Sequence, residues 1–394
     1  MLYKKERNYI IALLKCAITN QTPSIPSETV DWDYIFNIAK KHKIIPTLYF
    51  AIQKLPKSQQ QAVKYYNQYQ LAYKKTLVLD ANRAYEIETL KSDFEKNNLD
   101  YIFLKGSITK HLYPDTAMRV MSDIDIFYRG ASAKCVDKIF LKNGYRISHR
   151  EPKEVSYFKP VNKIYIEMQT LLVDEGYENW FHYLSTAWER FQKEDNSHEY
   201  KMTREDFYIY HIIHMAKHFI NGGIGVTHVM DIWMMLKCYA DMDYKYIEEQ
   251  LNILELTLFH KNMKMLALQW FGDNKSGGDN VHILTLLEDY IFSSGAFGIK
   301  SQQEINAMIR RDDDKVSLRK KIFPNRNTMI DYYGSILKKY PWLIPFYWVR
   351  LNYKRIVSDR KKIKNNINIM NSISKEQINL TKELMKECGF IEKK

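Results

Sequence analysis

The chain has 394 residues, of which 45% are hydrophobic and 27% charged, a composition typical of globular proteins and not of disordered or fibrous ones. No apolar run approaches the ~18 residues of a membrane-spanning helix, and the N-terminal segment has no signal-peptide cleavage pattern. The four cysteines are far apart and form no CxxC pair, which disfavours a zinc site or a disulfide framework. These features predict a cytoplasmic protein.

The net charge of +13 is distributed unevenly along the chain. Residues 301–394 contain 21 Lys+Arg against 10 Asp+Glu, a net of +11, which leaves +2 for residues 1–300. Such a basic region binds nucleic acid, nucleotide phosphates or an anionic membrane surface, or it is a solvated helical surface without a partner. The sequence leaves both interpretations open.

Residues 1–97 are predicted to be helical. Apolar side chains recur at helical spacing near the start of the chain, at Ile10, Leu13, Leu14 and Ala17. Asp31 or Asp33 is placed to cap a second helix, and Pro46 to begin a third. Residues 59–97 contain neither glycine nor proline, so they predict one long helix or two.

A small sheet is predicted within residues 98–175. Residues 101–104 form a short β-rich run that ends at Gly106. Residues 122–128 alternate as a strand does, with Ile124 and Ile126 on one face. The other predicted elements are a helix at 132–143 and strands at 145–149, 155–158 and 163–171. This order of elements indicates a sheet of mixed direction.

Residues 176–394 are again predicted to be helical. Thr203 begins a helix that runs through Phe219 and is closed by Asn221-Gly222-Gly223. Further helices are predicted near 227–240, 244–271 and 281–293 and over most of 302–390. The fold class is therefore α+β: a small mixed sheet at 98–175, flanked by large N- and C-terminal helical regions at 1–97 and 176–394.

Two aspartates share the polar face of the strand at 122–128. Asp123 and Asp125 are two positions apart and therefore point the same way, roughly 7 Å from one another by strand rise. Two carboxylates so close repel each other and are costly to bury without a partner. A divalent cation removes that cost, and Mg²⁺ takes oxygen ligands of this kind while sharing its other positions with substrate phosphates.

The segment Lys105-Gly106-Ser107 is placed to bind those phosphates. It lies where a strand ends and a helix begins, so amide groups and the Ser107 hydroxyl are expected to face phosphate oxygens. Gly106 allows close approach of the backbone. Lys105 and Arg119 are expected to add positive charge, although each fits a structural salt bridge equally well.

A third acid completes the pattern if the strand at 163–171 lies beside the strand at 122–128. Ile164, Ile166 and Met168 share one face of that strand, and Glu167 lies on the other. Glu167 then faces the two aspartates. It would either bind a second metal ion or act as the general base.

Together these residues resemble the active-site signature of the polymerase-beta-type nucleotidyltransferase superfamily: Gly106-Ser107, a gap, Asp123-Ile124-Asp125-Ile126 and a late-strand acid at Glu167. More narrowly, segments within about 30–350 are similar to a bacterial family of uncharacterised nucleotidyltransferases. These segments are Leu104-Lys105-Gly106, Leu112-Tyr113-Pro114, Arg119, Ser122-Asp123-Ile124-Asp125, the helix His214-Met215-Ala216-Lys217-His218 with Asp231, and Tyr340-Pro341-Trp342. Relatives tend to have a histidine where this chain has Gln169.

The resemblance implies an enzyme that transfers a nucleoside monophosphate from an NTP such as ATP to an acceptor hydroxyl and releases pyrophosphate. It implies Mg²⁺ as cofactor, in a two-metal site at Asp123, Asp125 and Glu167. The acceptor stays open between a small hydroxylated compound, the 3′ end of tRNA and a protein side chain, and the oligomeric state is not predicted. The alternative is a non-catalytic nucleotide-binding or scaffold protein of the same fold.

Two further groups of residues allow a structural and a functional interpretation. His211, His214 and His218 share one helix face, which suits a metal site less well than packed histidines that hydrogen-bond Asp231 or line the substrate cleft. The segment Phe346-Tyr347-Trp348, with Arg350, Lys354 and Arg355 nearby, suits core packing better than a membrane-surface helix or a base-stacking surface.

Overall fold

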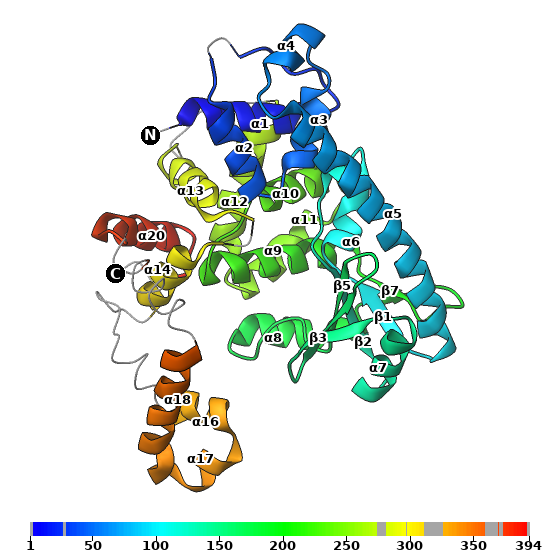
Figure 1. The fold of residues 1–394 in the computed structure, drawn as a ribbon, viewed down its shortest axis with the longest axis vertical. Coiled ribbons are helices and arrows are strands. Elements are labelled where there is room, and N and C mark those ends of the chain that lie inside the picture. Colours follow the sequence, from blue (N-terminus) through cyan, green and yellow to red (C-terminus); the bar gives the residue numbers. More distant parts are fainter. Residues whose placement is uncertain are drawn as a thin grey trace.

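The computed structural model describes residues 3–26, 29–273, 281–296, 298–310, 326–358, 369 and 373–391. Figure 1 shows a small sheet covered on one side by a long helix and joined on the other to a larger helical body. This arrangement confirms the predicted α+β class, with helical regions before and after the sheet.

The N-terminal region contains five helices: α1 Lys4–Ile18, α2 Trp32–Lys41, α3 Ile45–Ile52, α4 Lys57–Ala62 and α5 Tyr66–Lys96. Asp31 caps α2, because its carboxylate accepts hydrogen bonds from the amides of Asp33 and Tyr34. Pro46 lies in the first turn of α3, where its missing N–H costs nothing. The stretch without glycine or proline forms two helices, the second of which has 31 residues.

The central sheet has five strands in the order β1-β2-β5-β4-β3. Their bounds are β1 Asp100–Phe103, β2 Ile124–Arg129, β3 Arg146–Arg150, β4 Glu154–Lys159 and β5 Ile164–Gln169. The β2–β5 pair is parallel and the other neighbouring pairs are antiparallel, so the sheet is mixed as predicted. The β1–β2 connection holds α6 Gly106–Thr109, η1 Lys110–Leu112 and η2 Thr116–Met118, and α7 Ala133–Lys142 joins β2 to β3.

The two faces of this sheet have different roles. One face is apolar and packs on α5 and α7 through a buried cluster that includes Ile124, Ile126, Ile164, Ile166, Met168, Phe94 and Phe140. This packing confirms the predicted alternation in β2 and β5. The opposite face carries acidic side chains and turns toward the helical body, where Phe127 stacks on Trp188 with 5.0 Å between ring centroids.

The helical body after the sheet comprises α8 Glu178–Ser185, η3 Ala187–Glu189, α9 Arg204–Asn221, α10 Val226–Cys238, α11 Tyr244–Ile253, α12 Thr257–Phe271, α13 Val281–Ser294, α14 Lys300–Arg310 and α20 Lys375–Glu387. Its hydrophobic core also includes the N-terminal helices, because one buried cluster extends from Tyr9 to Cys388. Figure 1 shows α1 lying against α12. The two helical regions therefore hold the sheet between them through shared packing.

A two-stranded hairpin, β6 Gln192–Lys193 and β7 Tyr200–Lys201, interrupts the region predicted to be only helical. It lies beside β1, where Tyr101 and Glu199 form a bridge. The prediction missed it because strands of two residues carry no detectable alternation.

The helices α16 Arg326–Tyr333, α17 Ser335–Lys339 and α18 Ile344–Ser358, with η4 Pro341–Leu343, form a small unit that we call the arm (residues 326–358). Figure 1 shows the arm projecting away from the helical body. It has its own small core of Met329, Leu337, Ile344 and Leu351. The predicted core packing of the aromatic segment is correct for Tyr347 and Trp348, which pack on this core, and wrong for Phe346, which is 69% exposed.

Among the residues that the structure describes, no helix combines the length and apolar character needed to cross a membrane. All four cysteines are free thiols, as the absence of paired spacing predicts.

Candidate active site

Three acidic side chains meet on the polar face of the sheet. Asp125 on β2 and Glu167 on β5 are Cα partners across the parallel pair, and Asp123 directly precedes β2. Ser156 on β4 is the partner of Glu167 on its other side. The register therefore brings together the three acids that the sequence pattern predicted to face one another.

Burial and the neighbouring carboxylates change the protonation of Glu167 and Asp123. Burial, followed by the charges of Asp123 and Asp125, raises the pKa of Glu167 to about 7. Burial and the charge of Asp125 likewise raise the pKa of Asp123. The site thus concentrates negative charge that only a cation or a proton can relieve.

Lys105 already supplies one such cation. Its Nζ lies 2.6 Å from Oδ1 of Asp125, and the same oxygen accepts a hydrogen bond of 3.0 Å from Nε2 of Gln169. Burial lowers the pKa of Lys105, but the charge and hydrogen bond of Asp125, together with smaller contributions that include the charge of Asp123, outweigh burial, so the pKa is raised overall. Gln169 therefore has a clear role, since it helps to hold the carboxylate of Asp125.

The backbone around Lys105 is shaped to place this amine. Lys105 has φ 48° and ψ −123°, a region that non-glycine residues rarely adopt and that is common at functional sites. A hydrogen bond from the Leu104 amide to the Asp125 carbonyl fixes the preceding residue to β2. Gly106 has to be small, because a Cβ there would lie 2.9 Å from Cγ of Met121.

Ser107 carries a buried hydroxyl directly after Gly106 in the chain. Its side chain is 8% exposed, and its Oγ has no hydrogen-bond partner among the described protein atoms. The amides of Ser107 and Ile108 already donate to the carbonyls of Leu104 and Lys105. The helix-start amides on which the sequence prediction relied are therefore in use at these two positions, and the hydroxyl is the group that can accept a ligand here.

Arg119 lies in a separate, fully formed network. Its Nε and Nη2 donate to the carboxylate of Asp231, with distances of 2.8 to 3.0 Å, and its Nη1 donates to the Val120 carbonyl. The hydroxyl of Tyr113 donates to the same carboxylate at 2.7 Å, and Asp231 is completely buried. The structure thus places Arg119 in a salt bridge that joins the β1–β2 connection to α10.

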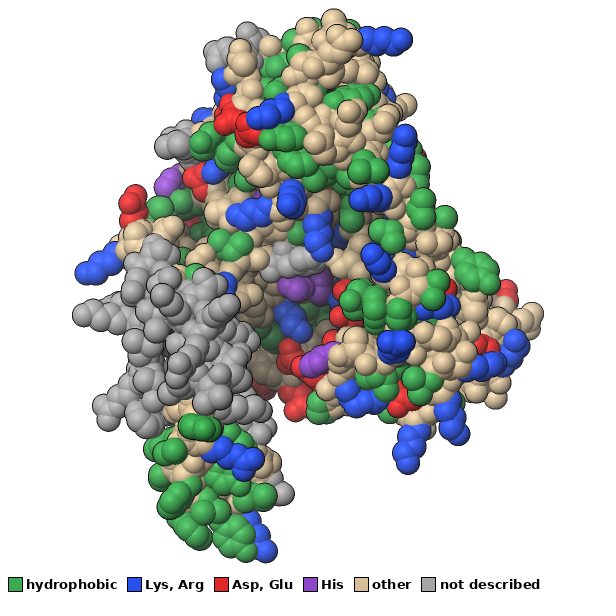
Figure 2. Space-filling model, in the orientation of Figure 1, with side chains coloured by type: hydrophobic (Ala, Val, Ile, Leu, Met, Phe, Trp, Pro, Cys, Tyr) green, Lys and Arg blue, Asp and Glu red, His purple; other side chains and the backbone are tan. Residues whose placement is uncertain are grey.

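A cavity of about 590 Å³ opens above the acids. Asp123, Glu167 and Ser156 line it, and so do two cations that sequence reasoning missed, Lys43 and Lys163. Nζ of Lys43 lies 2.8 Å from Oγ of Ser122. Figure 2 shows acidic, basic and histidine side chains gathered around a hollow in the middle of the molecule. No local motif marks Lys43, which is 80 residues before Asp123 in the chain.

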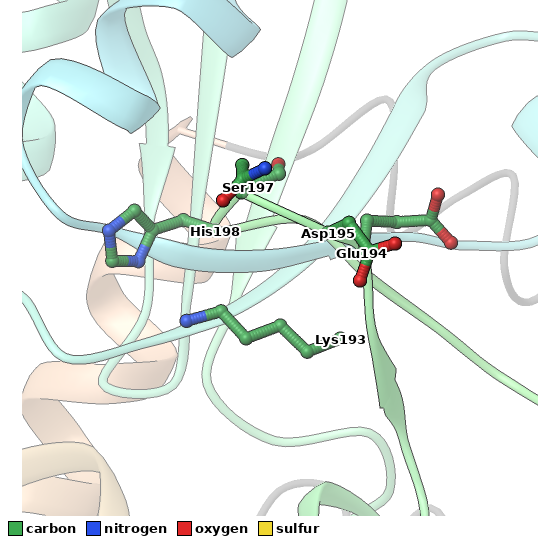
Figure 3. A pocket seen from close by; sticks show the side chains of 6 residues that line it. Lys193, Glu194, Asp195, Ser197 and His198 are labelled. Atoms are coloured by element: carbon green, nitrogen blue, oxygen red, sulfur yellow. The ribbon is translucent and has the colours of Figure 1, made fainter.

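A second cavity, of about 430 Å³, lies over the turn of the hairpin and is lined only by residues 193–198. Figure 3 shows His198 and Lys193 on one side of this turn and the Glu194 and Asp195 carboxylates on the other. Its central polar groups are already paired, because His198 bonds Asp100 at 2.8 Å and Ser197 bonds Glu95 at 2.6 Å. This cavity therefore offers little unsatisfied chemistry, and the acidic cavity is the candidate site.

The histidines of α9 form a cluster with His228 of α10. Ring centroids are 4.4 Å apart for His214 and His218, and 6.2 Å apart for His218 and His228. Burial, followed by the positive charge of Lys105, lowers the pKa of His218 to about 4. The cluster is therefore neutral at neutral pH and lies within electrostatic reach of the Lys105 amine.

The predicted hydrogen bond from these histidines to Asp231 is wrong. Tyr113 and Arg119 occupy that carboxylate, and Nε2 of His211 is buried without a partner among the described atoms. Throughout the described part of the chain, no three His, Cys, Asp or Glu side chains are grouped closely enough to hold a metal ion.

Asp123, Asp125 and Glu167 carry the type of oxygen donor that binds a divalent cation. Burial, followed by the charge of neighbouring carboxylates, raises the pKa of both Asp123 and Glu167, and a divalent cation such as Mg²⁺ would relieve this repulsion. The amine of Lys105, however, occupies Asp125 in this conformation. In this conformation the three acids are not grouped closely enough to hold a metal ion together. The oxygen donors of Asp123 and Glu167 are of the type that Mg²⁺ takes, and Asp125 can join them only after Lys105 leaves.

A mixed sheet that carries Asp-x-Asp on one strand and a third acid on the parallel neighbour, after a Gly-Ser turn, is the arrangement expected of a nucleotidyltransferase core. The family model described as "Uncharacterised nucleotidyltransferase" matches residues 28–272. The chain belongs to this family. The match covers the sheet and the helices from α2 through α12, and it ends before the arm. A comparison with curated proteins and one with solved structures find no match.

Proposed function

We propose that the protein is a Mg²⁺-dependent enzyme that transfers a nucleoside monophosphate from an NTP to an acceptor hydroxyl. The observation that carries the proposal is the register of β2 and β5, which aligns Asp125 with Glu167 beside Asp123 at the edge of a cavity. Family membership supports nucleotidyl transfer as the reaction class.

Some side chains of the site would bind the triphosphate and its metal, and another would activate the acceptor. Asp123 and Asp125 would hold the metal, which supplies neutralisation of charge on the phosphate oxygens when bound. Glu167 has a pKa of about 7, suited to a general base that accepts the proton of an attacking hydroxyl near neutral pH. Ser107 and the cavity cations Lys43 and Lys163 would contact the phosphates.

Lys105 has two positions in this proposal. Without substrate its amine neutralises Asp125 at 2.6 Å. An incoming triphosphate offers more negative charge than one carboxylate, so the amine would move to the phosphates, and Asp125 would then be free to hold the metal. Catalysis then depends on positioning and charge neutralisation.

Three classes of acceptor are compatible with this proposal: a small hydroxylated compound, a tRNA 3′ end and a protein side chain. A tRNA acceptor requires several phosphate contacts, so its binding would weaken steeply with salt, whereas that of a small uncharged acceptor would not.

One observation favours a second candidate function, a non-catalytic nucleotide-binding protein. The ion pair between Lys105 and Asp125 could be permanent, with the amine in the place of a metal. Such a protein would bind an NTP without Mg²⁺ and release no pyrophosphate.

Incubation of the full chain with each α-labelled NTP, Mg²⁺ and a cell lysate distinguishes the two candidates. The enzyme proposal predicts Mg²⁺-dependent label on one class of lysate molecule, together with pyrophosphate. Calorimetry with the same NTP, with and without Mg²⁺, completes the test. Binding that is equally tight without Mg²⁺, with no label transferred from any NTP, would contradict the enzyme proposal.

A further inference from the structure

The arm carries an unusual stripe of exposed apolar side chains. Trp342, Phe346, Val349 and Tyr353 are 68%, 69%, 71% and 69% exposed. Their spacing of four, three and four residues puts them on one face of η4 and α18. Over 11 residues this face extends roughly 16 Å at the usual helical rise.

The opposite face of α18 is apolar as well. Ile344 and Leu351 are buried in the core of the arm, and Tyr347 packs on it with its ring 4.6 Å from that of Tyr333. Apolar side chains on two opposite faces of one helix are normally covered on both faces. We define residues 342, 346, 349 and 353 as the exposed stripe. Its exposure indicates a surface that contacts an apolar partner.

Cations surround the stripe. Lys338, Lys339 and Arg350 are exposed, and Lys339 lies over the ring of Tyr340, itself 6.5 Å from Trp342. In the sequence, the arm contains six Lys+Arg and one Asp+Glu, a net of +5. A partner of this surface must accept apolar side chains and carry negative charge.

We propose that the arm binds the surface of an anionic lipid bilayer. Trp and Tyr beside Lys and Arg, on a helix too short and too polar to span, are the features of a helix that lies in the membrane interface. The surface inserts Phe346 and Val349 among the acyl chains, while the flanking cations contact lipid headgroups.

Two other partners fit less well. A second copy of the arm would place two net charges of +5 against each other, which opposes pairing. A nucleic acid matches the charge, but aliphatic side chains such as Val349 and Ile336, 71% and 50% exposed, offer no stacking surface to its bases. The lipid surface satisfies both the charge and the apolar requirement.

Vesicle co-sedimentation of the full chain tests the proposal. We expect binding to vesicles of phosphatidylcholine mixed with phosphatidylglycerol, and much weaker binding to phosphatidylcholine alone. The triple variant Trp342→Ser, Phe346→Ser, Val349→Ser should reduce partitioning roughly tenfold or more through lost apolar burial. Replacing Lys338, Lys339 and Arg350 with Gln should reduce it roughly fivefold for each cation near the surface.

A matched control changes exposed apolar residues elsewhere. Val161, Ile253 and Leu258 are 92%, 62% and 45% exposed, and changing all three to Ser should leave vesicle binding unchanged. Asp125→Asn should also bind vesicles as the wild type does, so the outcome is independent of the proposed enzymatic activity. Equal sedimentation of the stripe variant and the wild type would overturn the proposal. The proposal would also be overturned if the wild type bound neither type of vesicle but formed a dimer or bound tRNA through the stripe.

Discussion

The amine of Lys105 lies 2.6 Å from a carboxylate oxygen of Asp125, and Asp125 is also the cross-strand partner of Glu167. A single side chain thus neutralises the middle of a group of three acids. The strained backbone of Lys105 indicates that the fold maintains this contact at a cost, which is usual where a residue serves a function.

Removing the amine should destabilise the protein. Lys105→Met leaves the Asp125 carboxylate, 6% exposed, without its cation, and breaking a buried pair from one side costs about 3–5 kcal/mol. The double variant Lys105→Met, Asp125→Asn should recover a large part of this loss, because no unpaired charge remains. Denaturant unfolding of the four proteins measures the coupling. Strictly additive losses would show that the pair does not act as a unit.

The same variant should bind Mg²⁺ better. With Lys105 replaced by Met, all three acids are available to a cation, so added Mg²⁺ should raise the melting temperature more than in the wild type. Thermal unfolding with and without Mg²⁺ measures this without reference to activity. Asp123→Asn in the same background provides the control and should abolish the gain. An identical Mg²⁺ effect in wild type and Lys105→Met would mean that the amine does not compete with the metal.

Glu167 should make stability depend on pH. Its pKa is raised to about 7 in the folded protein from an ordinary value of 4.5, so between these values the folded state keeps a proton that the unfolded state releases. Stability contributed by that proton is therefore present at low pH and lost as pH rises toward 7 and beyond. Glu167→Gln should be more stable than the wild type at about pH 8, with a smaller difference at about pH 5. Melting curves that differ by a constant amount across this range would contradict the assignment.

Arg119 should stabilise the folded protein without contributing to the binding of NTP. Its guanidinium holds Asp231 with two nitrogens, and a lysine ammonium cannot reproduce that geometry. Both Arg119→Lys and Asp231→Asn should lower the free energy of unfolding, by about 3 kcal/mol or more where a buried charge loses its partner. Calorimetric titration with Mg²⁺ and NTP should show a dissociation constant close to that of the wild type for Arg119→Lys. A large loss of NTP affinity in a stably folded variant would instead support the phosphate contact expected from the sequence.

The acids were predictable because strand alternation is local. Ile124 and Ile126 fix one face of β2, so Asp123 and Asp125 must share the other face. By the same reasoning, Glu167 lies on the face of β5 that Met168 does not occupy. Their meeting required only that the two strands be neighbours. The mixed sheet and the long helix α5 follow from similar short-range patterns.

The remaining features depend on contacts between distant segments. Lys43 reaches the cavity from the end of α2, and Asp231 reaches Arg119 from α10, 112 residues away. Neither contact leaves a trace in local spacing. The sequence also could not predict which group the Lys105 amine binds, because a lysine next to Gly-Ser can pair with a phosphate or with a carboxylate. Phe346 is exposed although it follows the apolar pattern of a core helix, since the arm has too few helices to cover both faces of α18.

The most direct test of the central claim is transfer of α-label from an NTP by the wild type and by Asp125→Asn, with both proteins shown to be folded by circular dichroism. Asparagine keeps the shape of the side chain and can still accept a hydrogen bond from Lys105, but it cannot supply the charge that the metal needs. The account predicts labelled acceptor and pyrophosphate with the wild type and neither with the variant. Consumption of labelled NTP by Asp125→Asn at the wild-type rate would contradict it.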